Sequence, residues 1–143
     1  MDLENKPNKA LWSNDMLVPF DEESDKRTYT FTNCWNNSVY YHGNVPNNEF
    51  KLYKKVTIVL GKSVSSKESF LFTLGKSDYM KISNISLKKG DKIVYDGVQT
   101  WRNGTPINHR CTNAQPKFYP GWNDFAFNQQ VKSVTFDMKF YYK

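Results

Sequence analysis

Apolar and polar residues alternate along two long stretches of the chain, and this two-residue rhythm restricts the fold more than any other feature of the sequence. In residues 49–60, EFKLYKKVTIVL, the even positions carry most of the apolar side chains. In residues 131–143, apolar side chains recur at every even position from Val134 to Tyr142. Because successive side chains of a strand point to opposite faces, this pattern predicts strands with one buried face and one solvent face.

Shorter alternating segments, separated by turn signals, extend the pattern along most of the chain. They are TYTFTN (28–33), SVYYHG (38–43), ESFLFTL (68–74), DYMKIS (78–83) and KIVY (92–95). Asn103-Gly104 favours a two-residue hairpin turn, and no stretch carries a helical apolar stripe over three turns. The sequence therefore predicts an all-β protein: a single antiparallel β-sandwich, jelly-roll-like, of about eight to ten strands.

Composition and charge indicate how the chain is organised. Its 143 residues suit one domain, and with 10 Phe, 9 Tyr and few alanines the predicted core consists largely of aromatic rings. Residues 1–25 hold seven acidic residues and two lysines, a net charge of −5, so the remaining chain must carry +11 to give the total of +6. We predict an extended acidic N-terminal arm over residues 1–27, lying across a β-sandwich domain over residues 28–143.

The familiar signatures of catalysis and cofactor binding do not fit this chain. The two GKS triplets lack the glycine that a phosphate loop needs five residues earlier. The spacing of Cys34, His42, His109 and Cys111 is not that of a zinc site, and no GxSxG nucleophile motif occurs. The acidic residues outside the arm do not form an evident catalytic pair. We therefore predict a non-enzyme with no cofactor and no metal.

Three of the four tryptophans lie beside asparagine-rich segments, and they supply the candidate site. An indole ring can pack against the apolar face of a pyranose, while nearby amide, carboxylate and guanidinium groups bind its hydroxyls. The sequence predicts a non-catalytic, lectin-like carbohydrate-binding domain with a glycan ligand. Its site is expected to form from three loops: Trp35, Asn36, Asn37; Trp101, Arg102, Asn103; and Trp122, Asn123, Asp124.

Other interpretations of the same residues stay open. The basic body suits a polyanion or an anionic membrane surface, so the chain could bind single-stranded nucleic acid or anionic lipid. Tyrosines on the outward face, among them Tyr53 and Tyr141, suit a homo-oligomeric, self-assembling structural or cytolytic β protein. Any single tryptophan could instead fill the open end of a sandwich, as large aromatics commonly do in cores.

The beginning of the chain and its cysteines bear on its location. MDLENKPNKALW has acids and a proline where a signal peptide needs a basic patch and an apolar run. The expected location is cytoplasmic if Met1 is the native start, and otherwise extracellular after removal of a leader. Cys34 and Cys111 could pair or remain reduced, and a leaderless chain favours reduced thiols.

Overall fold

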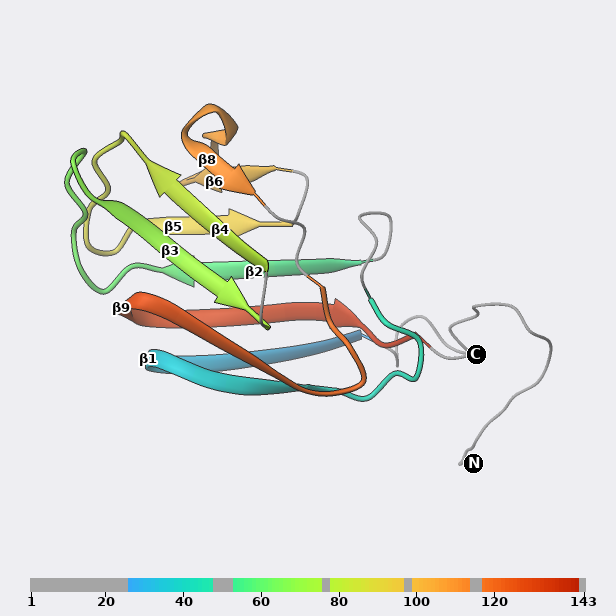
Figure 1. Ribbon diagram of the computed structural model, residues 1–143. Helices are drawn as coiled ribbons and strands as arrows, with labels where there is room; N and C mark the ends of the chain where they lie inside the picture. Colours follow the sequence, from blue (N-terminus) through green and yellow to red (C-terminus); the bar gives the residue numbers. More distant parts are fainter. Residues whose placement is uncertain (1–25, 48–52, 76–77, 97–98, 114–116, 142–143) are drawn as a thin grey trace.

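The computed structural model shows a protein built almost entirely of antiparallel β-structure (Figure 1). It describes residues 26–47, 53–75, 78–96, 99–113 and 117–141. Within these ranges there is no α-helix, and one turn of 3-10 helix, η1, is the only helical element. The elements are β1 (Lys26–Tyr41), β2 (Lys54–Val59), β3 (Ser69–Leu74), β4 (Asp78–Ser83), β5 (Lys92–Tyr95), β6 (Thr100–Arg102), β7 (Thr105–Pro106), η1 (Asn108–Arg110), β8 (Cys111–Asn113) and β9 (Gly121–Lys139).

The nine strands form one continuous sheet around the long strand β9. The order is β7-β6-β5-β2-β9-β3-β4-β8, and β1 also pairs with β9. The C-terminal part of β9 pairs with β2, from Ser133 to Met138, whereas its N-terminal part pairs with β3, from Phe125 to Phe127. Strand β9 therefore belongs to two limbs of the sheet: the first contains β2, β5, β6 and β7, and the second contains β3, β4 and β8.

The sheet curls so that the two limbs face each other across the core. Phe72 of β3 lies 6.2 Å from Tyr95 of β5, measured between ring centroids, although β9 and β2 separate these strands in the sheet. Phe136 of β9 is fully buried and contacts the rings of Phe31, Phe72, Phe118 and Phe125, with centroids between 4.7 and 6.4 Å away. Edge-to-face and tilted ring pairs of this kind stabilise a core beyond the area that they bury.

An irregularity in the pairing of β1 with β9 marks the place where the chain bends between the limbs. Cys34 pairs with Val131, but Asn36 pairs with Ala126, so β9 advances five residues while β1 advances two. Asn33 has a φ of +49°, a left-handed conformation that asparagine tolerates better than most residues. Because bulges of this kind bend a strand and increase its twist, β1 and β9 can follow both limbs.

Most of the strands expected from the two-residue rhythm are present, and the all-β class is confirmed. Asn103 and Gly104 have φ values of +49° and +88° and connect β6 to β7, as the hairpin prediction required. The apolar rhythm changes phase after β4, where Asn84 has a φ of +61°. The predicted arm over residues 1–27 falls almost wholly outside the described residues, and β1 begins at Lys26.

Two segments differ from their sequence-based expectation. Residues 35–37, expected in a loop, lie inside the 16-residue strand β1, and residues 122–124, also expected in a loop, lie near the start of β9. Strand β9 therefore begins at Gly121, ten residues before the alternation in 131–143. Asn123, Asp124 and Asn128 give this segment the composition of a turn, which conceals the strand that buries Phe125 and Phe127.

Replacing Phe136 by alanine tests the aromatic core. Because the ring is fully buried among four others, Phe136→Ala should lower the free energy of unfolding by about 3–5 kcal/mol, measured by urea denaturation. Tyr119→Ala removes a ring that is 47% exposed, and it should cost about 1 kcal/mol or less. Equal losses for both variants would contradict this description of the core.

Candidate functional site

A row of aromatic side chains lies on the outward face of the β1–β9 pair. Trp122 is 71% exposed and pairs across the strands with Tyr40, whose ring centroid lies 5.0 Å from the indole at an interplanar angle of 75°. His42 continues the row, 4.4 Å from Tyr40. We call Tyr40, His42 and Trp122 the aromatic row. Its edge-to-face contacts hold the indole in a defined orientation although one of its sides is open to solvent.

Strand alternation and a buried amide position Trp122. Its neighbour Asn123 points inward and is 6% exposed. The Asn123 side chain accepts a hydrogen bond from the Tyr119 amide (3.0 Å) and donates to the carbonyls of Tyr119 (2.9 Å) and Gly121 (3.0 Å). These bonds fix the bend at Gly121, whose φ of +97° suits glycine. Asn123 therefore supports the aromatic row from beneath and does not reach the surface.

Polar side chains flank the aromatic row on the same outward face. Asp124 pairs with Ser38, whose hydroxyl donates a hydrogen bond to the carboxylate. Asn36 is exposed opposite Ala126 on this face, whereas Asn37 pairs with the buried Phe125 and accepts a hydrogen bond from the Ser38 amide (2.8 Å). Residues two apart along a strand share a face, so Asp124 and Ser38 lie directly beside Trp122 and Tyr40. The face thus combines flat apolar rings with hydroxyl, carboxylate and amide groups.

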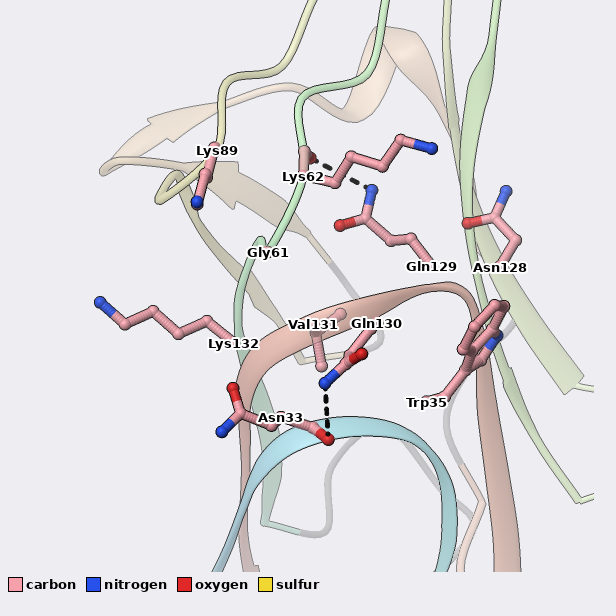
Figure 2. Close-up of a pocket in the computed structure, with 10 residues that line it drawn as sticks. All are labelled: Asn33, Trp35, Gly61, Lys62, Lys89, Asn128, Gln129, Gln130, Val131 and Lys132. Carbon is pink, nitrogen blue, oxygen red and sulfur yellow. Dashed lines mark hydrogen bonds between the residues drawn. The ribbon is translucent and has the colours of Figure 1, made fainter.

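A second feature, a cavity of about 720 Å³, lies where β1 and β9 bulge (Figure 2). We call it the lysine cavity, since three of its lining side chains are lysines and none is a carboxylate. Its lining residues are Asn33, Trp35, Gly61, Lys62, Lys89, Asn128, Gln129, Gln130, Val131 and Lys132. Trp35 is 56% exposed and lines the cavity together with Asn128 (Figure 2).

Hydrogen bonds fix the amide side chains around the lysine cavity. Gln129 donates to the Lys62 carbonyl (3.2 Å), and Gln130 donates to the Asn33 carbonyl (3.2 Å). Asn128 accepts from the Leu71 amide (3.1 Å). The carbonyl oxygen of the Gln129 side chain is buried and has no hydrogen-bond partner among the described residues. The lining thus includes three lysines and a glutamine whose buried side-chain oxygen has no partner.

The third predicted group, Trp101, Arg102 and Asn103, lies in the first limb, where Arg102 and Asn103 bind the Asp91 carboxylate. Arg102 Nε lies 2.7 Å from Asp91 Oδ2, and the Asn103 side chain donates to Asp91 Oδ1 (3.1 Å). The Asn103 side chain also accepts from the Lys92 amide (2.9 Å). Trp101 is half-buried on β6, which β5 and β2 separate from β9 in the sheet.

Asp91 is the charged centre of that group. Burial would raise the pKa of its carboxyl, but hydrogen bonds from the Lys88 amide, Asn103 and Arg102, together with the Arg102 charge, lower the pKa below its usual value. The carboxylate therefore ties the turn before β5 to the β6–β7 hairpin.

The structure thus gathers part of the predicted site and divides the rest. The predicted groups 35–37 and 122–124 both lie on the β1–β9 pair. Residues 101–103 lie on β6 and the turn after it, in the first limb. All three tryptophans lie in strands and not in loops. The asparagines beside them lie next to a bulge (Asn36), in a hairpin turn (Asn103) and at a buried strand position (Asn123). Tyr40, His42 and the cavity lysines were not predicted, since only the strand register brings them near the tryptophans.

Metal ligands do not cluster in the described part of the chain, and its two cysteines are free. Within the described ranges, no three His, Cys, Asp or Glu residues cluster so as to hold a metal ion. Cys34 and Cys111 are unpaired, and burial raises the pKa of each thiol. Among the helices of the described chain, none is long and apolar enough to cross a membrane.

No protein-family model matches the chain, and no curated protein is significantly similar to it in sequence.

Replacing Asp91 by asparagine tests how much its carboxylate contributes to stability and how that contribution depends on pH. The folded pKa is lower than the unfolded one, so the carboxylate stabilises the fold above pH of about 4 and this stabilisation is lost as the pH falls further. Asp91→Asn should therefore lower the free energy of unfolding at pH 7 by about 1–3 kcal/mol, measured with urea. The difference from wild type should shrink in acid. A difference that is the same at pH 7 and pH 3 would contradict the assignment.

Proposed function

We propose that this protein is a non-catalytic, lectin-like carbohydrate-binding domain that binds its glycan on the aromatic row. We also interpret the curled sheet as a jelly-roll-like β-sandwich, formed by the two facing limbs. The observation that carries the proposal is the exposed indole of Trp122, held in place by Tyr40 and flanked by Asp124 and Ser38. An exposed aromatic surface rimmed by ordered polar groups is a common feature of ligand-binding sites.

The chemistry of the row matches that of a pyranose. The exposed face of the Trp122 ring can accept the C–H face of the sugar, and Asp124 can accept hydrogen bonds from adjacent hydroxyls. Ser38 already donates to Asp124, which orients the carboxylate before any ligand arrives. Preorganised groups lose little conformational entropy on binding, so a small flat surface can still bind a sugar specifically.

The same outward face is large enough for more than one sugar unit. Ala126 pairs with Thr73 of β3, and Thr73 pairs with Tyr79 of β4, which is 40% exposed. Tyr79 therefore extends the polar and aromatic face away from Trp122 across the second limb. We propose that the ligand is an oligosaccharide lying across the strands, with its first unit on the aromatic row.

A binding function accounts for the row better than hydrolysis does. Glycosidases generally place two carboxylates on opposite sides of the scissile bond. Among the described residues of the two strand segments that form the row, 36–42 and 121–126, Asp124 is the single carboxylate. The predicted nucleic-acid, anionic-lipid and cytolytic functions, the homo-oligomer and the location of the protein stay predictions.

A glycan array probed with purified protein tests the proposal. Wild type should bind a subset of glycans, and binding should persist in 0.5 M salt, because stacking and neutral hydrogen bonds are screened little compared with phosphate contacts. Trp122→Ala should weaken binding at least about tenfold, which corresponds to the loss of about 1.4 kcal/mol of stacking, while the melting temperature stays close to that of wild type.

Trp101→Ala is the matched control, since it removes another indole from the opposite limb. It should bind the same glycans as wild type. If no glycan is bound while retention on an oligonucleotide or anionic-lipid surface falls steeply with salt, the proposed function is wrong. It is also wrong if Trp101→Ala abolishes binding and Trp122→Ala does not.

A further inference from the structure

The lysine cavity is distinct from the aromatic row, and the strand bulge creates it. Strand β9 carries three more residues than β1 between the pairs Cys34–Val131 and Asn36–Ala126. The extra length lies along 127–130, the segment that supplies one wall of the cavity. Bulges interrupt the ladder and redirect side chains, and they recur beside functional sites for this reason. The segment after β2 and the turn before β5 supply the opposite walls.

Close packing keeps the walls of the cavity together. A Cβ atom on Gly61 would lie 2.3 Å from the Gln130 carbonyl oxygen, a distance at which the backbone would have to move. Only glycine allows the segment after β2 to approach β9 this closely. The Lys89 amide also donates to the Ser63 hydroxyl (3.0 Å), which ties the turn before β5 to the same segment. The positions of Lys62 and Lys89 are therefore set by the backbone around them.

The charge of the cavity is unbalanced. The ammonium groups of Lys62, Lys89 and Lys132 have no ion pair or hydrogen bond to any described residue. Glu68, an acidic side chain that lines the adjoining surface together with Lys62, accepts a hydrogen bond from the Ser65 amide (3.0 Å) and closes its own turn. Three like charges around one hollow repel one another, and an anion bound there would relieve this repulsion.

An anion alone would leave one group unsatisfied. Gln129 is 7% exposed, and its amide nitrogen donates to the Lys62 carbonyl, which can only accept. This bond fixes the orientation of the side chain, so its oxygen is the buried acceptor without a partner. An unsatisfied buried acceptor is costly, and a ligand hydroxyl that donated to it would remove the cost. The complementary ligand therefore carries both a hydrogen-bond donor and a negative charge.

The arrangement of the side chains indicates the size of the ligand. In Figure 2, Lys62, Gln129, Asn128 and Trp35 lie on one side of the Gly61 segment, and Lys89 and Lys132 lie on the other. The exposed Trp35 ring offers a flat apolar wall on the side where the unused oxygen is found. One sugar ring would suit that side, and a charged substituent on a neighbouring unit would reach the two lysines on the other side.

We propose that the lysine cavity is a second ligand site and that it binds an anionic oligosaccharide bearing sulfate or carboxylate groups. A sugar hydroxyl donates to Gln129 Oε1, the ring rests against Trp35, and the anionic groups contact Lys62, Lys89 and Lys132. This site uses none of the residues of the aromatic row, so the proposal does not depend on the function assigned to that row.

Titration calorimetry with a heparin-derived tetrasaccharide tests the site. Wild type should bind it in 0.15 M salt, and a chemically desulfated tetrasaccharide should bind at least about tenfold more weakly. The double variant Lys89→Gln/Lys132→Gln should lose at least about tenfold in affinity and show a smaller dependence on salt. Lys81→Gln, which removes an exposed lysine on β4, is the matched control and should bind as wild type does.

Further measurements distinguish recognition of the sugar ring from recognition of the negative charge. Trp35→Ala should weaken binding of the tetrasaccharide, with melting curves of all variants recorded to verify the fold. Inorganic sulfate at equal ionic strength should compete poorly, since it offers no donor to Gln129. The proposal is overturned if the tetrasaccharide does not bind, if Trp35→Ala and the lysine variant bind like wild type, or if sulfate or an oligonucleotide of equal charge binds equally well.

Comparison with Trp122→Ala keeps this site apart from the aromatic row. That variant should retain full affinity for the tetrasaccharide, whereas the lysine double variant should retain the array binding of neutral glycans. A protein that binds the tetrasaccharide but no neutral glycan would support the lysine cavity and contradict the function of the row. The opposite result would support the row and overturn the lysine cavity.

Discussion

The shift in register between β1 and β9 is the constraint on which the rest of the structure depends. Between the pairs Cys34–Val131 and Asn36–Ala126, β9 contains three more residues than β1. Both strands therefore bend there and can follow two limbs of one sheet. The bend lets the limbs face each other and enclose the rings around Phe136. It also opens the lysine cavity and leaves the aromatic row on the outward side of the same pair. One irregularity thus produces both the core and the two candidate binding surfaces.

Alternation made much of the fold predictable, and it failed where the chain bends. Along β2, the buried residues Val56 and Ile58 keep a strict period of two, and Asn103-Gly104 forms the hairpin that its chemistry favours. Along β9 the buried positions keep this period from Asn123 to Val131, but the phase shifts before Val134, in the part of the strand opposite Asn33. Near the bulge, asparagines that point outward give the strands an amino-acid composition typical of a loop. The bend depends on pairing between residues about ninety positions apart, which local propensity does not encode.

The candidate site was also predictable only in part, because local sequence indicates single residues but not which residues strand pairing brings together. Surface indoles were predicted at Trp35 and Trp122 from the asparagines beside them, and both rings are more than half exposed. Their neighbours could not be predicted, since Tyr40 reaches Trp122 only through the register and the cavity lysines come from three separate segments. Arg102 has the composition of a sugar ligand but forms an ion pair with Asp91. A carboxylate eleven residues earlier in the chain thus decides its role.

Assignment of binding to the β1–β9 pair, and not to the first limb, is the central claim. Indole N–H signals in a two-dimensional ¹H–¹⁵N NMR spectrum report on each tryptophan separately, and alanine variants assign them. On titration with a bound glycan, the Trp122 signal should shift progressively while the Trp101 signal stays in place. A shift of the Trp101 signal with an unchanged Trp122 signal would contradict the claim, because it would place the ligand on β6.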